Sequence, residues 1–198
     1  MKLVVVGGVA GGASAAARVR RLDETAEITI FERGQYVSYS NCSLPYYLGG
    51  EVADQEDLIM MTPEAFKSKH NIDVCTNTEV TAVDPAAHTV TVCTAEGERT
   101  VPYDKLVLAP GAAPILPRSI SGIGGAHVHA VRSVTDVVRI RADLDRQDAR
   151  RVIVVGGGFI GVETAENLCR AGKQVTVVEG APQIMAPFDH DMVQTLHK

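Results

Sequence analysis

Residues 2–12 read KLVVVGGVAGG, an apolar run that ends in a glycine-rich turn. The β-branched run up to Val6 is typical of a strand that is buried on both faces of a parallel sheet. After the glycines, Ala13–Leu22 is rich in alanine and arginine and predicts a helix, and Ile28–Glu32 predicts a second strand. The order of strand, glycine turn, helix and strand predicts a βαβ unit of an α/β fold.

The same stretch has the chemistry of a dinucleotide site. Glycines let the backbone approach a pyrophosphate, and the start of the helix offers N–H donors and positive potential. Glu32 follows Gly12 by about 20 residues, the usual distance of the acid that binds the ribose hydroxyls. Val9 occupies the second glycine position of the G-x-G-x-x-G pattern, so this motif alone is only moderately specific.

A second βαβ unit begins at residue 151 with RVIVVGGGFIG, in which all three motif glycines are present. Val162–Ala171 predicts its helix, with Gly172 at the C-terminal cap, and Val175–Glu179 predicts its second strand. An acid at Glu179 favours NADH, because its charge would repel the 2′-phosphate of NADPH, although Lys173 lies nearby.

Between the two motifs, residues 37–47 read VSYSNCSLPYY and place Cys42 directly ahead of a predicted short helix. Pro45 suits the first turn of that helix, and the start of a helix stabilises a thiolate. Two interpretations stay open from this stretch alone: a reactive thiol, or a small buried residue, which is the usual role of a free cysteine.

The remaining segments predict further elements of an α/β fold. Thr62 is a candidate N-cap for a helix over Pro63–His70. Three short alternating runs predict a small antiparallel meander, a later apolar run predicts a buried strand, and a further segment predicts a helix. These are Glu79–Asp84, His88–Cys93 and Arg99–Pro102, then Lys105–Ala109, and then Val134–Asp145.

Composition excludes several classes of function. A net charge of −5, with no Lys/Arg run longer than two residues, gives no footprint for nucleic acid. The cysteines at 42, 75, 93 and 169 form no CxxC pair, which favours reduced thiols in a cytoplasm over disulfides or a metal site. We expect Cys75, Cys93 and Cys169 to be packing residues. No apolar stretch approaches the ~18 residues of a membrane span, so no membrane association is expected.

Two dinucleotide motifs and one reactive-looking thiol together indicate electron transfer. One motif would hold a nicotinamide donor and the other a flavin within reach of the cysteine. The combination is more specific than either glycine motif alone.

The sequence resembles the flavin-dependent pyridine nucleotide-disulfide oxidoreductases of the single-cysteine type, which include coenzyme A disulfide reductases and NADH-dependent persulfide reductases. The resemblance runs through almost the whole chain. Its most specific part is Ser38-x-x-Asn41-Cys42-x-Leu44-Pro45-Tyr46, supported by Asp57-Leu58, by Thr62–Glu64 and by Tyr103–Ala112. Reductases with a redox cysteine pair carry their second cysteine five residues after the first, where this chain has Tyr47. Two positions depart from the common pattern, Ser43 in place of glycine and His70 in place of a frequent lysine.

The resemblance implies FAD and NADH as cofactors, with NADPH less favoured. FAD would lie on the first glycine turn, at Gly7, Gly8, Val9, Ala10, Gly11 and Gly12, with Glu32 and Arg33 at the adenosine ribose and Val80 at the adenine. Further FAD contacts are implied for Ala109, Pro110, Gly111, Ala112, Ala113 and Arg132. NADH would lie on Gly156, Gly158, Ile160, Gly161 and Glu179.

The resemblance also implies the chemistry at the thiol. Cys42 and Asn41 would be catalytic, and a coenzyme A-linked disulfide or persulfide would contact Ser14, Arg18, Arg21, Ser38 and Asn41. Arg18 and Arg21 lie three apart on one helical face and could meet phosphates, although a solvated basic face is an equal alternative.

Neighbouring branches and an inactive fragment remain alternatives. NADH oxidases and peroxidases of this family usually carry a histidine in the first glycine loop, where this chain has Ala10, so sulfur substrates are favoured over peroxide or oxygen. Residues 1–120 would form the first part of an FAD-binding domain, 121–150 a connector and helix, and 151–198 the start of an NAD-binding domain. Because family members are longer and form homodimers, a nucleotide-binding fragment without catalysis is the remaining alternative.

Overall fold

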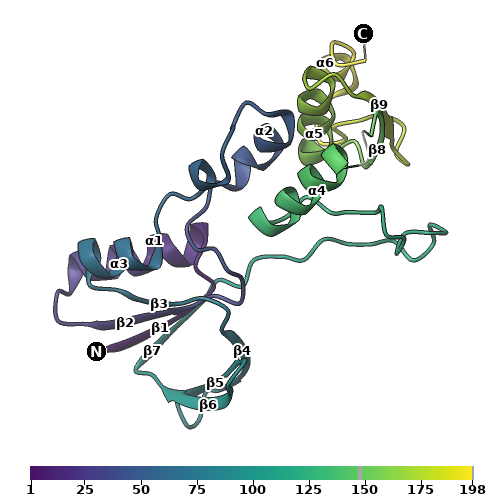
Figure 1. Cartoon of the computed structure of the whole chain (residues 1–198). Helices are drawn as coiled ribbons and strands as arrows, with labels where there is room; N and C mark the ends of the chain where they lie inside the picture. The colour runs from purple at the N-terminus through teal and green to yellow at the C-terminus, as the bar shows by residue number, and fades with distance from the viewer. Residues whose placement is uncertain (147–148, 198) are drawn as a thin grey trace. The chain divides into compact units, whose positions relative to one another are not determined.

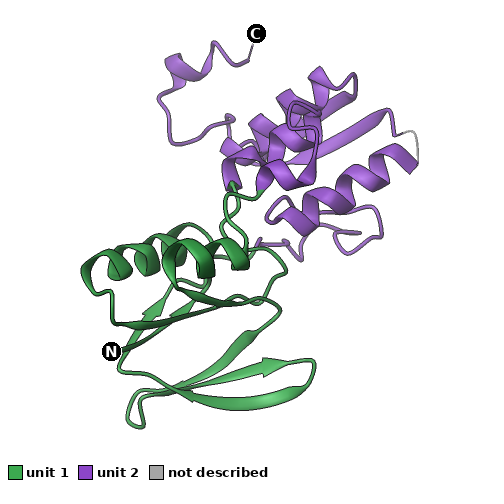
Figure 2. Cartoon of the chain, turned by 60° about the vertical axis from the view of Figure 1, so that its left-hand side comes forward, with its two compact units in different colours: residues 1–40, 59–113 green, residues 41–58, 114–198 purple. Residues whose placement is uncertain are grey.

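The computed structural model describes residues 1–146 and 149–197 and confirms an α/β fold with parallel sheets and a small antiparallel sheet (Figure 1). It divides into two compact units, residues 1–40 with 59–113 and residues 41–58 with 114–198 (Figure 2). The segment that contains Cys42 therefore belongs to the second unit, although the first unit flanks it in sequence. The domain limits expected from the sequence remain predictions.

The first unit contains three layers. Its central sheet is parallel, with the order β3-β2-β1-β7. Helices α1 and α3 cover one face of this sheet, and an antiparallel sheet with the order β4-β5-β6 covers the other (Figure 1). The bounds are β1 Lys2–Val6, α1 Ala10–Leu22, β2 Glu27–Phe31, α3 Pro63–His70, β3 Asp73–Cys75, β4 Glu79–Asp84, β5 Thr89–Thr94, β6 Gly97–Pro102 and β7 Lys105–Leu108.

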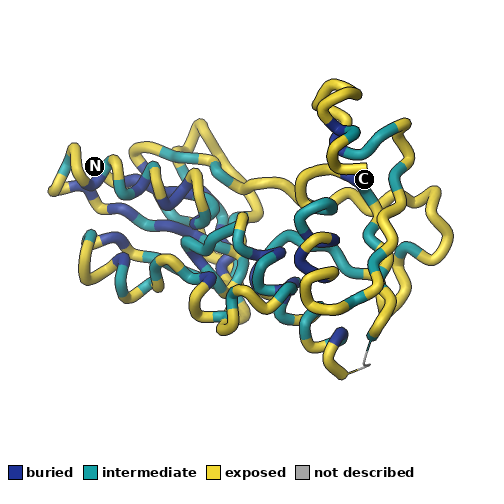
Figure 3. The backbone as a smooth tube through the Cα atoms, turned by 90° about the horizontal axis from the view of Figure 1, so that it is seen from above, coloured by how far each residue is buried: buried dark blue, intermediate teal, exposed yellow. Residues whose placement is uncertain are grey.

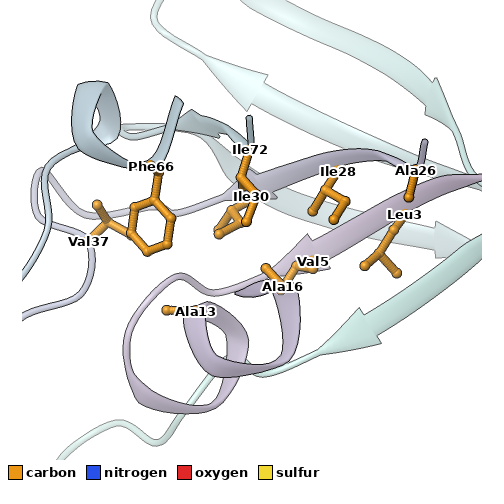
Figure 4. Packing of buried hydrophobic residues seen from close by; sticks show 10 residues of the cluster. All are labelled: Leu3, Val5, Ala13, Ala16, Ala26, Ile28, Ile30, Val37, Phe66 and Ile72. Atoms are coloured by element: carbon orange, nitrogen blue, oxygen red, sulfur yellow. The ribbon is translucent and has the colours of Figure 1, made fainter. Parts of the chain in front are cut away.

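Successive side chains along each strand point to opposite faces of the sheet, and so form the hydrophobic cores on both sides of it. On β1, Leu3 and Val5 pack toward the helices, whereas Val4 packs toward the antiparallel sheet. The cluster on the helical face also contains Ile28 and Ile30 of β2 (Figure 4). Burial of one such large apolar side chain contributes about 1.5–3 kcal/mol to folding. The β-branched run at the N-terminus is thus buried on both faces, as the sequence predicts.

The second unit contains the parallel pair β8 (Arg151–Val155) and β9 (Gln174–Val178), with α5 (Phe159–Arg170) between them in sequence. It also contains the short helix α2 (Leu44–Gly49), which packs against both α5 and α4 (Val134–Arg146). A 3-10 turn over Asn41–Ser43 precedes α2, a second 3-10 turn covers Gln55–Leu58, and α6 covers His190–Val193. The strands of this unit are less buried than β1 and β2 (Figure 3).

Several local predictions are confirmed. Thr62 caps α3 by accepting a hydrogen bond from the Ala65 N–H, and the three runs from 79 to 102 form the antiparallel meander. Pro45 lies in the first turn of α2. Gly172 has a φ of +79° just after α5, the left-handed conformation expected of a glycine at a helix end.

The structure differs from the prediction in several places. Helices α1 and α5 begin at Ala10 and Phe159, three residues earlier than predicted, because their first turns form inside the glycine motifs. Strand β3 was not predicted, since three residues at a sheet edge carry too little alternation to be recognised. No helix in the described part of the chain is long and apolar enough to span a membrane.

Arg20 is a buried cation that joins three segments of the first unit. Its guanidinium donates only to backbone carbonyls: Asp23, Glu24 and Ala26 just after α1, and His70 and Asn71 at the end of α3. The distances lie between 2.6 and 3.2 Å. Because helix ends leave carbonyls without intrahelical partners, this side chain satisfies groups that burial would otherwise penalise.

We predict that Arg20→Met lowers the free energy of unfolding by about 2–4 kcal/mol, because one buried and four partly buried hydrogen bonds to carbonyls lose their charged donor. Urea unfolding followed by far-UV circular dichroism measures the change. Arg21→Met, which removes an exposed neighbour on the same helix, is the matched control and should unfold like the parent chain. Equal stability of the two variants would contradict this role for Arg20.

Candidate functional site

The first glycine turn is shaped by a very close backbone approach. Gly7 has a φ of +91°, and its N–H donates to the Phe31 carbonyl at 2.8 Å. A Cβ built at Gly7 would lie 2.1 Å from the Ala109 carbonyl oxygen, and one at Gly12 would lie 1.8 Å from the Gly7 carbonyl oxygen. Both positions therefore require glycine. The strand end and the start of α1 come close enough to leave a bare backbone surface, as a pyrophosphate site needs.

Glu32 is the first residue after β2, rather than its last residue as the sequence predicts. Its two carboxylate oxygens accept hydrogen bonds from the Gly8 N–H and the Gly34 N–H, both at 2.8 Å. The acid thus holds the glycine turn against its own loop. A role at the ribose remains a prediction.

A groove with a volume of about 100 Å³ lies beside this turn, within the first unit. Five of the residues assigned to FAD from the sequence line it: Gly7, Glu32, Arg33, Val80 and Pro110. Sequence reasoning did not find the other residues that line the groove, because they carry no motif of their own. These are Val6, Phe31, Thr78 and Glu79.

The second glycine turn repeats the geometry of the first. Gly156 has a φ of +105°, and a Cβ at Gly161 would lie 1.9 Å from the Gly156 carbonyl oxygen. The carboxylate of Glu179 accepts hydrogen bonds from the Ala181 N–H at 2.7 Å and the Gly157 N–H at 2.6 Å. These backbone donors, with Ala181 contributing most, lower the pKa of Glu179. As for Glu32, a role at the ribose remains a prediction.

The two turns also explain why Val9 is compatible with the first motif. Its counterpart Gly158 has a φ of −79°, which any residue can adopt. A Cβ built at Gly158 would meet no other atom within 4 Å. The turn therefore has space for a side chain at this position, unlike at Gly161.

Cys42 has an exposed side chain and is a free thiol in the 3-10 turn that leads into α2. The exposed position excludes the interpretation that it is a buried packing residue. Next to it, the Asn41 side-chain oxygen accepts a hydrogen bond from Arg132 at 3.4 Å. The structure thus brings Arg132, which the resemblance assigns to FAD, against Asn41, which it assigns to the catalytic thiol.

The other cysteines differ from Cys42 in their surroundings. Cys75 and Cys93 are half-buried, as expected of packing residues, and burial raises the pKa of the Cys75 thiol. Cys169 is exposed near the end of α5, so the expectation that it packs in the interior is wrong.

Most of the remaining residues predicted for the site are exposed, and Ser38 has an unusual backbone conformation. Ser14, Arg18 and Arg21 are all exposed on α1, which leaves both interpretations of this basic face open. Ser38 has a φ of +49°, and its backbone is held by the Gly8 carbonyl and the Met60 N–H. The segment of Gly111, Ala112 and Ala113 that follows β7 is exposed, as are Ala10 and Ile160 at the starts of α1 and α5.

Comparison with known proteins gives one family over the whole chain. The model of the pyridine nucleotide-disulphide oxidoreductases matches residues 1–198. A coenzyme A disulfide reductase from Staphylococcus haemolyticus is 38% identical over 197 residues, which is 98% of this chain and 44% of that protein. An NADH oxidase from Methanocaldococcus jannaschii is 36% identical over 200 residues, again 44% of its length.

Solved structures give the same result. The reduced CoADR-RHD of Bacillus anthracis superposes with a TM-score of 0.95 at 45% identity, covering 99% of this chain and 36% of that one. An NAD-dependent persulfide reductase from A. fulgidus gives a TM-score of 0.94 at 37% identity, covering all of this chain and 37% of that one. The chain spans less than half the length of these relatives.

Enzymes of the matched family use FAD and a nicotinamide nucleotide. The repeated glycine turns, each closed by an acid, are the local structure that this cofactor pair requires. The chain belongs to the pyridine nucleotide-disulphide oxidoreductase family.

Proposed function

We propose that the chain supplies the FAD pyrophosphate site, the redox cysteine and the start of the NADH site of a flavin-dependent disulfide or persulfide reductase. The observation that carries the proposal is the exposed thiol of Cys42 in its Asn-Cys turn, with Tyr47 where a second redox cysteine would stand. One thiol between two dinucleotide turns is suited to electron transfer from nicotinamide through flavin to sulfur.

The residues of the first turn fit FAD. The backbone at Gly7 and Gly12 is too close to other backbone atoms to carry side chains, which leaves N–H groups available to a pyrophosphate. Glu32 and Arg33 line the adjacent groove, where an adenosine ribose would lie, and Val80 offers an apolar contact for adenine. When bound, FAD supplies two-electron transfer between NADH and sulfur.

Cys42 acts on the substrate directly. Its thiolate attacks one sulfur of a disulfide or persulfide, so that a new S–S bond forms at Cys42 while the old S–S bond breaks and a thiolate leaves. Two electrons from NADH then cleave the bond to Cys42 and release the second sulfur as a thiol. In sum, one disulfide, one NADH and one proton give two thiols and NAD⁺.

A coenzyme A-linked substrate is supported by the relatives that carry coenzyme A in their names and by the exposed basic face of α1. Arg18 and Arg21 offer two cations to phosphates, with Ser14 on the same helix. Ser38 and Asn41 precede the cysteine in sequence and complete the proposed contacts. A cytoplasmic location agrees with the four free thiols, and a homodimer remains a prediction.

Oxygen reduction is the second candidate, because an NADH oxidase is among the relatives. Delivery of a proton to a peroxide or to a sulfenate at Cys42 needs an acid close to the flavin. The first glycine turn offers Ala10 at the position where oxidases of the family carry histidine. This residue favours sulfur over oxygen as the electron acceptor.

We predict that the purified chain, reconstituted with FAD and desalted, retains a flavin absorption band at about 450 nm. Gly12→Ala should abolish retention, because its Cβ would lie 1.8 Å from the Gly7 carbonyl oxygen. Gly124→Ala places a methyl group in open space and is the matched control. A colourless parent chain would instead support the nucleotide-binding fragment without catalysis.

Replacement of the thiol tests the chemistry. In the flavin-loaded protein, Cys42→Ser should keep the flavin spectrum and lose NADH-dependent turnover of coenzyme A disulfide and persulfide by a factor on the order of 10³ or more. Cys169→Ser, which removes the other exposed thiol, should be fully active. Oxygen uptake is recorded in parallel, and NADH oxidation that depends on oxygen alone would replace the reductase assignment by the oxidase.

The charge of Glu179 should decide between the two nicotinamide nucleotides. Glu179→Gln keeps an acceptor for the turn but removes the negative charge, so the preference for NADH over NADPH should fall by roughly tenfold. Fluorescence titration with each nucleotide measures the two affinities. Glu166→Gln, which removes an exposed carboxylate from α5, is the control. An unchanged preference would show that another residue recognises the 2′ position.

A further inference from the structure

The helix that follows Cys42 is held at its C-terminal end by one cation from α4. Arg141 donates from Nη1 to the Tyr47 carbonyl oxygen at 2.6 Å. The centre of the same guanidinium lies 5.4 Å from the centroid of the Tyr47 ring, in a cation–π arrangement. Asp145, one turn along α4, lies 3.8 Å from the Arg141 Nε as a loose, largely exposed ion pair. Arg141 thus binds both the backbone and the side chain of one residue of α2.

Helix α2 needs such an external contact. It has six residues, whereas isolated helices below about 12–15 residues are marginal in water. Its last carbonyls have no intrahelical donors, and Gly50, with a φ of +85°, ends the helix with a hydrogen bond of 3.2 Å to the Tyr47 oxygen. A cation at this end complements the negative pole of the helix.

Other contacts also hold α2 in the second unit, where Leu44 and Leu48 are buried and the helix packs against both α4 and α5. Gly49 lies so close to α5 that a Cβ there would be 2.8–2.9 Å from atoms of Asn167, which fixes the distance between the helices. Glu51 and Arg170 form an ion pair at 2.7 Å, but both side chains are about half exposed, where such pairs contribute little. Arg141 alone among these contacts binds the helix end through both a hydrogen bond and a ring.

We propose that Arg141 is a positioning residue for Cys42. By binding Tyr47 it holds α2 folded and so holds the 3-10 turn of Asn41–Ser43, on which the thiol is carried, in one orientation. The inference rests on the proposed reactivity of Cys42 and extends it to a residue that touches neither the thiol nor a substrate. Arg132, which binds Asn41 on the other side of the thiol, holds the same turn from its N-terminal end.

The test is alkylation of individual cysteines with iodoacetamide across a range of pH, followed by mass spectrometry of peptides. Cys169, the other exposed thiol, is an internal reference on α5. In Arg141→Ala the alkylation rate of Cys42 should fall by about threefold at neutral pH, because the turn that carries the thiol loses its fixed orientation. The rate of Cys169 should not change.

Two further variants sharpen the test. Arg139→Ala removes an exposed arginine from the same helix and should match the parent chain. Arg141→Lys keeps the charge and a donor without the planar group. The Cys42 alkylation rate in this variant should therefore lie between those of Arg141→Ala and the parent chain. If Arg141→Ala does not fold, Tyr47→Leu removes only the ring contact and should lower the Cys42 rate by a smaller amount.

A Cys42 profile that is identical in Arg141→Ala and the parent chain would overturn the proposal. A parallel change at Cys42 and Cys169, with a lower melting temperature, would also overturn it, since Arg141 would then be structural only. Alkylation requires neither flavin nor turnover. A failure of the proposed reductase function would therefore appear in the turnover of Cys42→Ser and not in these profiles.

Discussion

A Cβ at Gly12 would lie 1.8 Å from the Gly7 carbonyl oxygen, and much of the first unit follows from that close approach. The approach forces the chain from β1 directly into α1, so that the helix starts within the glycine motif at Ala10. It also brings the Ala109 carbonyl after β7 against the same turn. One steric constraint thus joins the ends of two neighbouring strands to a helix start, which is where open α/β sheets bind their ligands.

The same constraint recurs in the second unit, together with the same carboxylate. Glu32 and Glu179 each bind one N–H of their glycine turn and one N–H two residues further along the chain. Each acid thereby orders its own turn. In the function that we propose, the same two acids would also bind a ribose, so the residues that order the turns would take part in nucleotide recognition.

Local patterns predicted the parts of the fold that depend on local rules. The run from Lys2 to Val6, the Thr62 cap and the glycine at 172 were all predicted, because each depends only on residues within a few positions. The roles of Arg20 and Arg141 were not predicted. The partners of Arg20 lie up to 51 residues away, and Tyr47 lies 94 residues from Arg141, so no local pattern indicates them. The exposure of Cys169 was missed for a similar reason, since the partners of a helical face depend on tertiary packing.

The central claim is that Cys42 is the sulfur that exchanges with the substrate and is reduced by NADH. Its most direct test is mass spectrometry of the FAD-loaded protein after mixing with coenzyme A disulfide or coenzyme A persulfide under anaerobic conditions. A covalent sulfur adduct should form on Cys42 and on no other cysteine, and it should disappear when NADH is added. The absence of an adduct on Cys42 with both reagents, or an adduct that NADH does not remove, would contradict it.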